Sequence, residues 1–169
     1  MNWIGAMLLI AATTLIGFDR SDRLKKRPQQ LRQLKTALQI MEAEIIYSQH
    51  TIRSVCQHVS NQIPNPLAHF FNLIANKISD SDDLALLWTQ ELKQLKSYTA
   101  LEQHELDILQ QFGNTLGQFD TNQQQKQIQL TLVHLDRLLA EAHDNYLALS
   151  KVYRGIGVLS GILIALVLI

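Results

Sequence analysis

The sequence is poor in the residues that interrupt or cross-link a chain. Its 169 residues include one cysteine, Cys56, so a disulfide within the chain is excluded. The single thiol fits a reducing compartment. Three prolines and seven glycines leave few turn signals, and no run of alternating apolar and polar residues is long enough to propose a sheet. This composition predicts an all-α protein.

Charge is absent from both ends of the chain. Residues 1–18 carry no charged side chain, and residues 155–169 carry none either. Eighteen helical residues extend about 27 Å, near the lower limit for crossing the hydrocarbon core of a bilayer. The second segment reaches that length if it begins at residue 152 and Arg154 reaches the interface. The ends therefore predict one transmembrane helix over residues 1–18 and another over residues 152–169.

Basic residues follow the first apolar segment instead of preceding it. The opening residues "MNW" contain no lysine or arginine, which disfavours a cleaved signal peptide. By the positive-inside rule, residues 19–151 are expected in the cytoplasm and both termini outside. In the second apolar segment, Gly157 and Gly161 form a GxxxG step that suits close helix packing in lipid. The membrane-proximal basic residues, expected to lie against anionic lipid headgroups, are Arg20, Arg23, Lys25, Lys26 and Arg27.

The cytoplasmic part is predicted to be an antiparallel bundle of about five helices. Arg27-Pro28 is expected to break the chain, because the residue before proline avoids the helical region. Thr99 and Glu102 form a capping-box pattern, and Asp120 stands as the cap of the last helix. The predicted helices cover residues 28–62, 66–78, 82–98, 99–113 and 121 to the end of the chain.

The last predicted helix carries the clearest periodicity. Its apolar residues repeat with alternating steps of four and three, the pattern of a heptad seam. Such a seam favours packing against the 28–62 helix within the chain, and a coiled coil with a second chain is the alternative. The seam consists of Ile128, Leu132, Leu135, Leu139, Ala142, Tyr146, Leu149 and Tyr153. The bundle is expected to bury it, with the stripe from Leu31 to Ile52, against Phe70, Phe71, Trp88 and Phe112.

Two glutamates stand inside the apolar run "LQIMEAEIIYSQHTI". Glu42 and Glu44 are two residues apart, so on one helix they point about 160° away from each other and cannot share a site. They border the two sides of the stripe that begins at Leu31. The favoured interpretation is a core-facing helix edged by charge; an acid/base pair would need a partner from another segment.

Sequence motifs for chemistry are also missing. There is no glycine-rich phosphate loop, no G-x-S-x-G and no H-E-x-x-H. Among six histidines, only His104 has a carboxylate three or four residues away, in Asp107. Cys56 and His58 are two apart, on different faces of a helix, and would be poor ligands together. The sequence predicts no enzyme, no metal and no cofactor.

Charge is unevenly distributed along the predicted cytoplasmic part. Residues 19–35 contain seven basic and two acidic residues, whereas residues 54–151 contain six basic and eleven acidic residues. Solvation of an ordinary surface explains such an acidic excess. A docking face for a basic partner is the sharper hypothesis.

Two blocks of residues resemble the stage III sporulation protein AB family. The first is "RPQQLRQLKTALQIMEAEIIYSQHTI", and the second is "FGNTLGQFDTNQQQKQIQL", with Gly113, Leu116, Gly117, Asp120 and Gln125-Lys126 at the family positions. The resemblance covers nearly the whole chain. Met41 replaces the family's usual leucine, and Thr51-Ile52 stands where the family has Thr-Pro-Leu. Without that proline, the first helix is expected to run on to "IPNP".

The resemblance implies a membrane-anchored assembly protein. The family is similar to the F-type platform proteins of type II secretion and type IV pilus systems. By that analogy the partner is the stage III sporulation AA ATPase, alongside other membrane subunits of the channel between mother cell and forespore. The location implied is the mother-cell-derived membrane around the forespore. No nucleic acid partner is implied, and a homo-oligomer is left open.

Partner contact is the role expected for three acidic residues: Glu42, Glu44 and Asp120. Two alternatives compete with this hypothesis. One is a regulatory or sensor domain with His50 as a phosphoacceptor, and the other is a thiol-dependent enzyme that uses Cys56 and His58.

Overall fold

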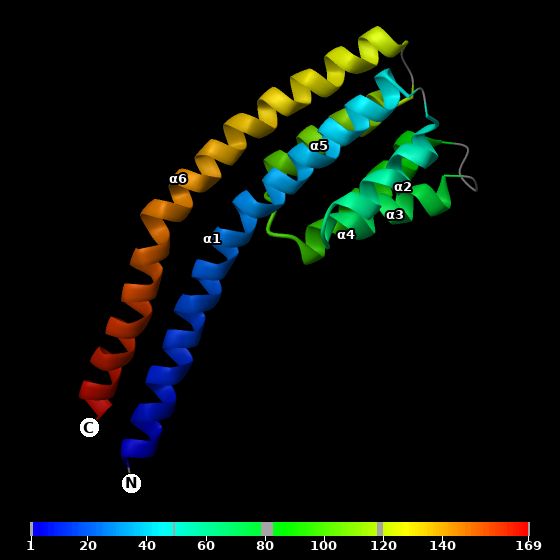
Figure 1. Ribbon diagram of the computed structural model, residues 1–169. Coiled ribbons are helices and arrows are strands. Elements are labelled where there is room, and N and C mark those ends of the chain that lie inside the picture. The colour runs from blue at the N-terminus through cyan, green and yellow to red at the C-terminus, as the bar shows by residue number, and fades with distance from the viewer. Residues whose placement is uncertain (1, 49, 79–82, 118–119, 169) are drawn as a thin grey trace. The chain divides into compact units, whose positions relative to one another are not determined.

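The structure is a computed structural model that describes residues 2–48, 50–78, 83–117 and 120–168. Side chains are described within these ranges from Leu24 to Val152, and beyond them only at Leu15, Asp19, Asp22, Gly155, Ile156 and Leu159. The described residues form six helices and no strand, which confirms the all-α prediction. The helices are α1 (Asn2–Ile46), α2 (Ile52–Gln62), α3 (Leu67–Lys77), α4 (Leu84–Tyr98), α5 (Gln103–Thr115) and α6 (Thr121–Leu168) (Figure 1).

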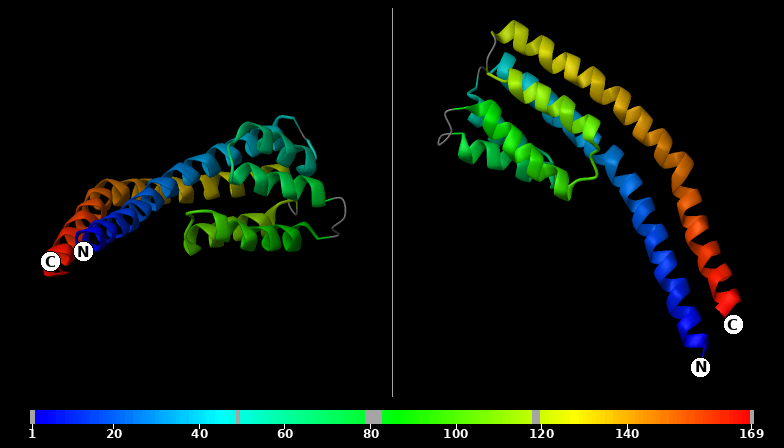
Figure 2. Two further views of the ribbon diagram at one scale, coloured as in Figure 1. Left: turned by 90° about the horizontal axis from the view of Figure 1, so that it is seen from below. Right: turned by 180° about the vertical axis from the view of Figure 1, so that it is seen from behind.

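The chain divides into two compact units. One consists of Met1–Pro28 and Ala140–Ile169, and the other of Gln29–Leu139. In the first unit, the first part of α1 and the last part of α6 run side by side in opposite directions (Figures 1 and 2). The sequence predicts membrane spans over residues 1–18 and 152–169. Among the residues that the structure describes, no helix is both long and apolar enough to cross a membrane.

The second unit is built around aromatic side chains. Helix α2 packs on α3, α3 on α4, and α4 on α5. Trp88 is fully buried, with ring centroids of Phe70, Phe71 and Phe112 at 5.0, 6.0 and 5.8 Å in edge-to-face geometry. Its indole N–H donates to the carbonyl oxygen of Leu109 at 2.9 Å, so the buried polar group is satisfied. The aromatic core predicted from the sequence is confirmed.

Helix α1 continues through Pro28, so the predicted break at this residue is wrong. A proline inside a helix costs about 3 kcal/mol or more, because it removes one N–H and crowds the preceding turn. Leu31, Leu34 and Leu38 follow on the same helix and are fully buried. Burial of each leucine contributes about 1.5–3 kcal/mol, so packing of the stripe outweighs the local cost of the proline.

The first helix ends at Ile46, and the prediction that it runs to residue 62 is wrong. Thr51 stands as the N-cap of α2, with φ −64° and ψ 149°, and its side chain accepts a hydrogen bond from the Ser54 N–H at 3.4 Å. Threonine caps a helix without a following proline. The chain therefore turns at Thr51 although no proline follows it.

Two further helix starts test the capping predictions. Helix α6 begins at Thr121 as predicted, with the Asp120 Oδ1 accepting from the Gln123 N–H at 2.8 Å. Helix α5 begins later than predicted, because the capping box is formed by Glu102 and Glu105. The hydroxyl of Thr99 instead donates to the Leu95 carbonyl at 2.8 Å and closes α4.

The seam of α6 is confirmed in part. Its buried positions are Gln124, Ile128, Thr131, Leu135, Leu138 and Ala142. Leu132 and Leu139, expected in the seam, are half-buried, and Leu149 is exposed. Tyr153 lies outside the described side chains. Within the second unit, α6 meets α1 through Lys35 and Asp136, whose charged atoms are 2.7 Å apart, which agrees with packing of this part of the seam within the chain.

Candidate functional site

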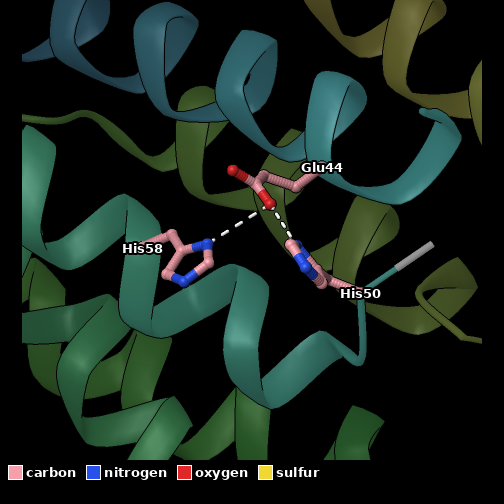
Figure 3. A group of neighbouring side chains, drawn as sticks. All are labelled: Glu44, His50 and His58. Carbon is pink, nitrogen blue, oxygen red and sulfur yellow. Dashed lines mark hydrogen bonds and ion pairs between the residues drawn. The ribbon is translucent and has the colours of Figure 1, made fainter. Parts of the chain in front are cut away.

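A glutamate and two histidines meet where α1 ends and α2 begins. Glu44 projects from α1, His50 from the turn, and His58 from α2 (Figure 3). The Oε2 of Glu44 lies 2.5 Å from the Nδ1 of His50 and 3.2 Å from the Nδ1 of His58. The two imidazole rings pack edge to face, with centroids 5.3 Å apart. One carboxylate oxygen thus faces two imidazoles.

The local fold explains why these three residues meet. Helix α1 ends with the Tyr47 N–H on the Ala43 carbonyl at 3.0 Å, and the His50 N–H then reaches the Glu44 carbonyl at 3.3 Å. These bonds turn the chain back and set the His50 side chain against the last turn of α1. Val55, Cys56 and Val59 turn inward from α2 and are buried, which leaves His58 on a partly exposed flank of α2.

Hydrogen bonds from the two histidines favour the ionised form of Glu44. The bond from His50 first, and then that from His58, hold the pKa of Glu44 below its ordinary value, against a smaller opposing effect of desolvation. Because an ionised carboxylate only accepts, each Nδ1 that bonds it carries a hydrogen. The side chains of Glu44, His50 and His58 are 21, 45 and 41 % exposed, so the cluster is reachable from solvent.

The cluster also has the composition of a metal-ligand set. Each of the three residues offers one ligand atom, and these atoms all lie within 4.8 Å of one another. Two imidazole nitrogens and one carboxylate oxygen are ligands typical of zinc and neighbouring divalent metals.

Cys56 has the environment of a core residue. Its side chain is fully buried, and burial raises the pKa of the thiol to about 12. A thiol with this pKa stays protonated at neutral pH and is a poor nucleophile. This environment gives no support to the thiol-dependent enzyme considered from the sequence.

The acidic residues expected to contact a partner lie in three different settings. Glu42 accepts a hydrogen bond from Gln129 of α6 at 3.1 Å, whereas Glu44 faces the histidines of the turn and α2. This confirms that the two glutamates point to opposite sides of α1. Asp120 caps α6 and is exposed. A role of the three residues in partner binding stays a prediction.

The predicted membrane-proximal basic residues differ in solvent exposure. Lys25 and Lys26 are exposed, and Arg27 is buried at 8 % exposure. Arg20 and Arg23 lie outside the described side chains, as do the predicted packing residues Gly157 and Gly161.

The histidine cluster was not predicted from the sequence, because ligands on one helix are expected three or four residues apart. Glu44, His50 and His58 are separated by six and eight residues, and the turn between two helices brings them together. The signal was Thr51, whose capping side chain permits a helix break at this point.

An ion pair with a buried carboxylate was also not predicted. Glu91 of α4 is 2 % exposed, and its Oε1 lies 2.6 Å from the Nζ of Lys77 on α3. Desolvation first, and then the charge of Glu91, raise the pKa of Tyr98 above its ordinary value. The pair joins two neighbouring helices of the second unit.

Comparison with known proteins gives consistent results. The model of the family described as stage III sporulation protein AB matches residues 2–169. A curated relative, stage III sporulation protein AB of Bacillus subtilis (strain 168), is 35 % identical over 169 residues, covering 99 % of each chain. A solved structure of stage III sporulation protein AB superposes with a TM-score of 0.67 at 36 % identity, covering 72 % of this chain and 96 % of that chain.

Proposed function

We propose that this protein, which belongs to the stage III sporulation protein AB family, is a non-catalytic assembly platform of the sporulation channel. The observation that carries this proposal is the 35 % identity to a curated family member along 99 % of both chains. The helical bundle and the buried, protonated thiol of Cys56 fit a scaffold.

A cytoplasmic secretion-type ATPase is the proposed partner, namely the stage III sporulation AA ATPase. This part of the proposal rests on the resemblance to F-type platform proteins of type II secretion and type IV pilus systems. The acidic excess between residues 54 and 151 supports a charged contact. We propose that Glu42, Glu44 and Asp120 contribute to a charged contact, because all three residues are at least partly exposed; of the three, Asp120 lies in the acidic segment.

Binding of the ATPase to the full chain, purified in detergent, across a salt series tests this docking. We expect binding that weakens as salt rises, because salt screens exposed charges. Glu42→Gln, Glu44→Gln and Asp120→Asn should each weaken binding, because each removes a negative charge. The amide oxygen that replaces Glu42 or Asp120 can still accept the hydrogen bond from Gln129 or from the Gln123 N–H. Asp107→Asn, an exposed position on α5, is the matched control. Binding that ignores salt and all three changes would contradict the charged interface.

Membrane anchoring is a separate part of the proposal. We propose that residues 1–18 and 152–169 hold the chain in the mother-cell-derived membrane around the forespore, with residues 19–151 in the cytoplasm and both termini outside. The uncharged segments and the basic cluster that follows the first one support it. Alkaline washing of membranes from sporulating cells tests it. Retention in the membrane pellet is expected, and release into the supernatant would contradict integral anchoring.

A further inference from the structure

We propose that Glu44, His50 and His58 form a binding site for one divalent transition-metal ion, with Zn²⁺ as the ion that fits best. The site would use one carboxylate oxygen of Glu44 and one ring nitrogen from each histidine. This inference goes beyond the platform function, which requires no metal.

The donor set favours zinc over the common hard cations. Imidazole nitrogen suits Zn²⁺, Co²⁺ and Ni²⁺, whereas Mg²⁺ and Ca²⁺ prefer oxygen ligands. Three protein ligands leave one position of a tetrahedral zinc site for water. The exposure of His50 and His58, 45 and 41 % of their side chains, gives the ion access from one side.

The distances are close to those of a loaded site. Zinc bonds of about 2.0–2.2 Å in a tetrahedron place neighbouring ligand atoms about 3.3–3.5 Å apart. The separation of the Glu44 oxygen from the His58 Nδ1 is already 3.2 Å, and that from the His50 Nδ1 is 2.5 Å. Entry of the ion therefore requires the His50 ring to withdraw by about 1 Å. His50 lies in the turn and not inside a helix, so a small side-chain rotation achieves this.

Two of the three proposed ligands stand on helices before any ion binds. Glu44 and His58 belong to separate helices, and the capped start of α2 at Thr51 fixes where the second helix begins. Cys56, two residues from His58, is fully buried and turned to the core, so it does not compete as a ligand. The ion would link the end of α1 to α2 across the turn. Its coordination bonds would replace the two hydrogen bonds between the imidazoles and the carboxylate.

Co²⁺ and Zn²⁺ titrations of the full chain test the site, with protein purified in detergent without a histidine tag and treated with chelator. We expect visible absorption of a low-coordinate Co²⁺ complex that saturates at one ion per chain and disappears when Zn²⁺ is added. Zn²⁺ should also raise the thermal unfolding midpoint, whereas Mg²⁺ and Ca²⁺ should not. Absence of a saturable Co²⁺ or Zn²⁺ complex would overturn the proposal and leave the cluster as a hydrogen-bonded one.

Single substitutions separate this site from binding by any exposed histidine. Glu44→Gln, His50→Gln and His58→Gln should each weaken Zn²⁺ binding by more than the roughly 10–100-fold that loss of an outer-shell partner costs. His69→Gln on α3, also exposed, is the matched control and should bind as the parent does. Equal loss in the control, or retention in all three ligand variants, would overturn the assignment. Circular dichroism verifies that each variant is folded.

The outcome is distinguishable from that of the platform test. Glu44 belongs to both proposals, so docking is judged from Glu42→Gln and Asp120→Asn in chelator-treated protein, and the metal site from His50→Gln and His58→Gln without the ATPase. Failure of either leaves the other intact.

Discussion

Two regions of the bundle are held together in different ways. Around Trp88, four aromatic rings and one glycine form a closely packed core, with one hydrogen bond from the indole to the Leu109 carbonyl. Around Glu44, a few polar atoms meet at a turn on the surface. Truncation of a side chain in the first region leaves a cavity in a close-packed interior. In the second region, solvent screens the exposed charges, so removal of one of them costs less stability. The first should therefore govern stability, and the second should respond to solution conditions.

Trp88→Ala is the change that should damage the core most. Removal of a fully buried indole costs about 3–5 kcal/mol of unfolding free energy, through lost burial and the cavity that remains. Trp88→Phe is the control, because it keeps a ring but loses the hydrogen bond to the Leu109 carbonyl. Denaturant unfolding followed by circular dichroism measures both. A cost no greater than that of a surface change would place the centre of the core elsewhere.

Alanine substitution of two glycines, one packed in the core and one without close neighbours, tests whether steric fit determines stability in the core. A Cβ added at Gly113 would lie 2.1 Å from the Cδ1 of Trp88, whereas one added at Gly155 meets nothing within 4 Å. Gly113→Ala should therefore destabilise by about 1–3 kcal/mol or more, because the indole must move. Gly155→Ala, inside the part of α6 proposed to span the membrane, should not destabilise, because the added Cβ meets no neighbouring atom. Thermal unfolding of both variants gives the signs, and equal signs would refute the packing argument.

These two regions also differ in how far the sequence predicts them. Phe70, Phe71 and Trp88 each belong to an apolar face of their own helix, so their burial follows from the helical spacing of that face. The Glu44 cluster depends on where one helix stops. A missing proline at residue 52 favoured a continuous helix, and the threonine before it proved sufficient to begin a new one.

Pro28 shows the opposite error for the same reason. There a local breaker was given more weight than the stripe of leucines that follows it, and the helix continues. Local signals and burial compete at each helix boundary, and the sequence does not state which one prevails. In α6, Thr131 is buried and Leu132 is only half-buried. An apolar side chain alone therefore does not determine which side of a helix packs against its neighbours.

Thr51→Ala should have an intermediate effect and connects the two regions. Loss of an N-cap side chain costs about 1 kcal/mol, and the first turn of α2 carries the backbone on which His58 is placed. Thr51→Ser keeps the hydroxyl and serves as the control. Unfolding measured by circular dichroism gives the cost, and Zn²⁺ affinity measured on the same variants should fall in the alanine variant alone. Equal stability of the two variants would show that the described hydrogen bond to Ser54 contributes nothing.

The pH dependence of Glu44 should be the smallest effect and is the one that belongs to the surface region alone. Its pKa is lowered from 4.5 by hydrogen bonds from His50 and His58. A carboxyl with a lowered pKa adds stability that is present above its unfolded pKa and lost as pH falls through the folded value. The difference in thermal midpoint between the parent and Glu44→Gln should thus be constant just above pH 4.5 and shrink on acidification below it. Trp88→Phe offers the contrast, because it removes no ionisable group and its cost should not follow this titration. A Glu44→Gln difference that stays unchanged through the acidic range would mean that the carboxylate and the imidazoles are not coupled in the folded protein, and the cluster would then lose its electrostatic basis.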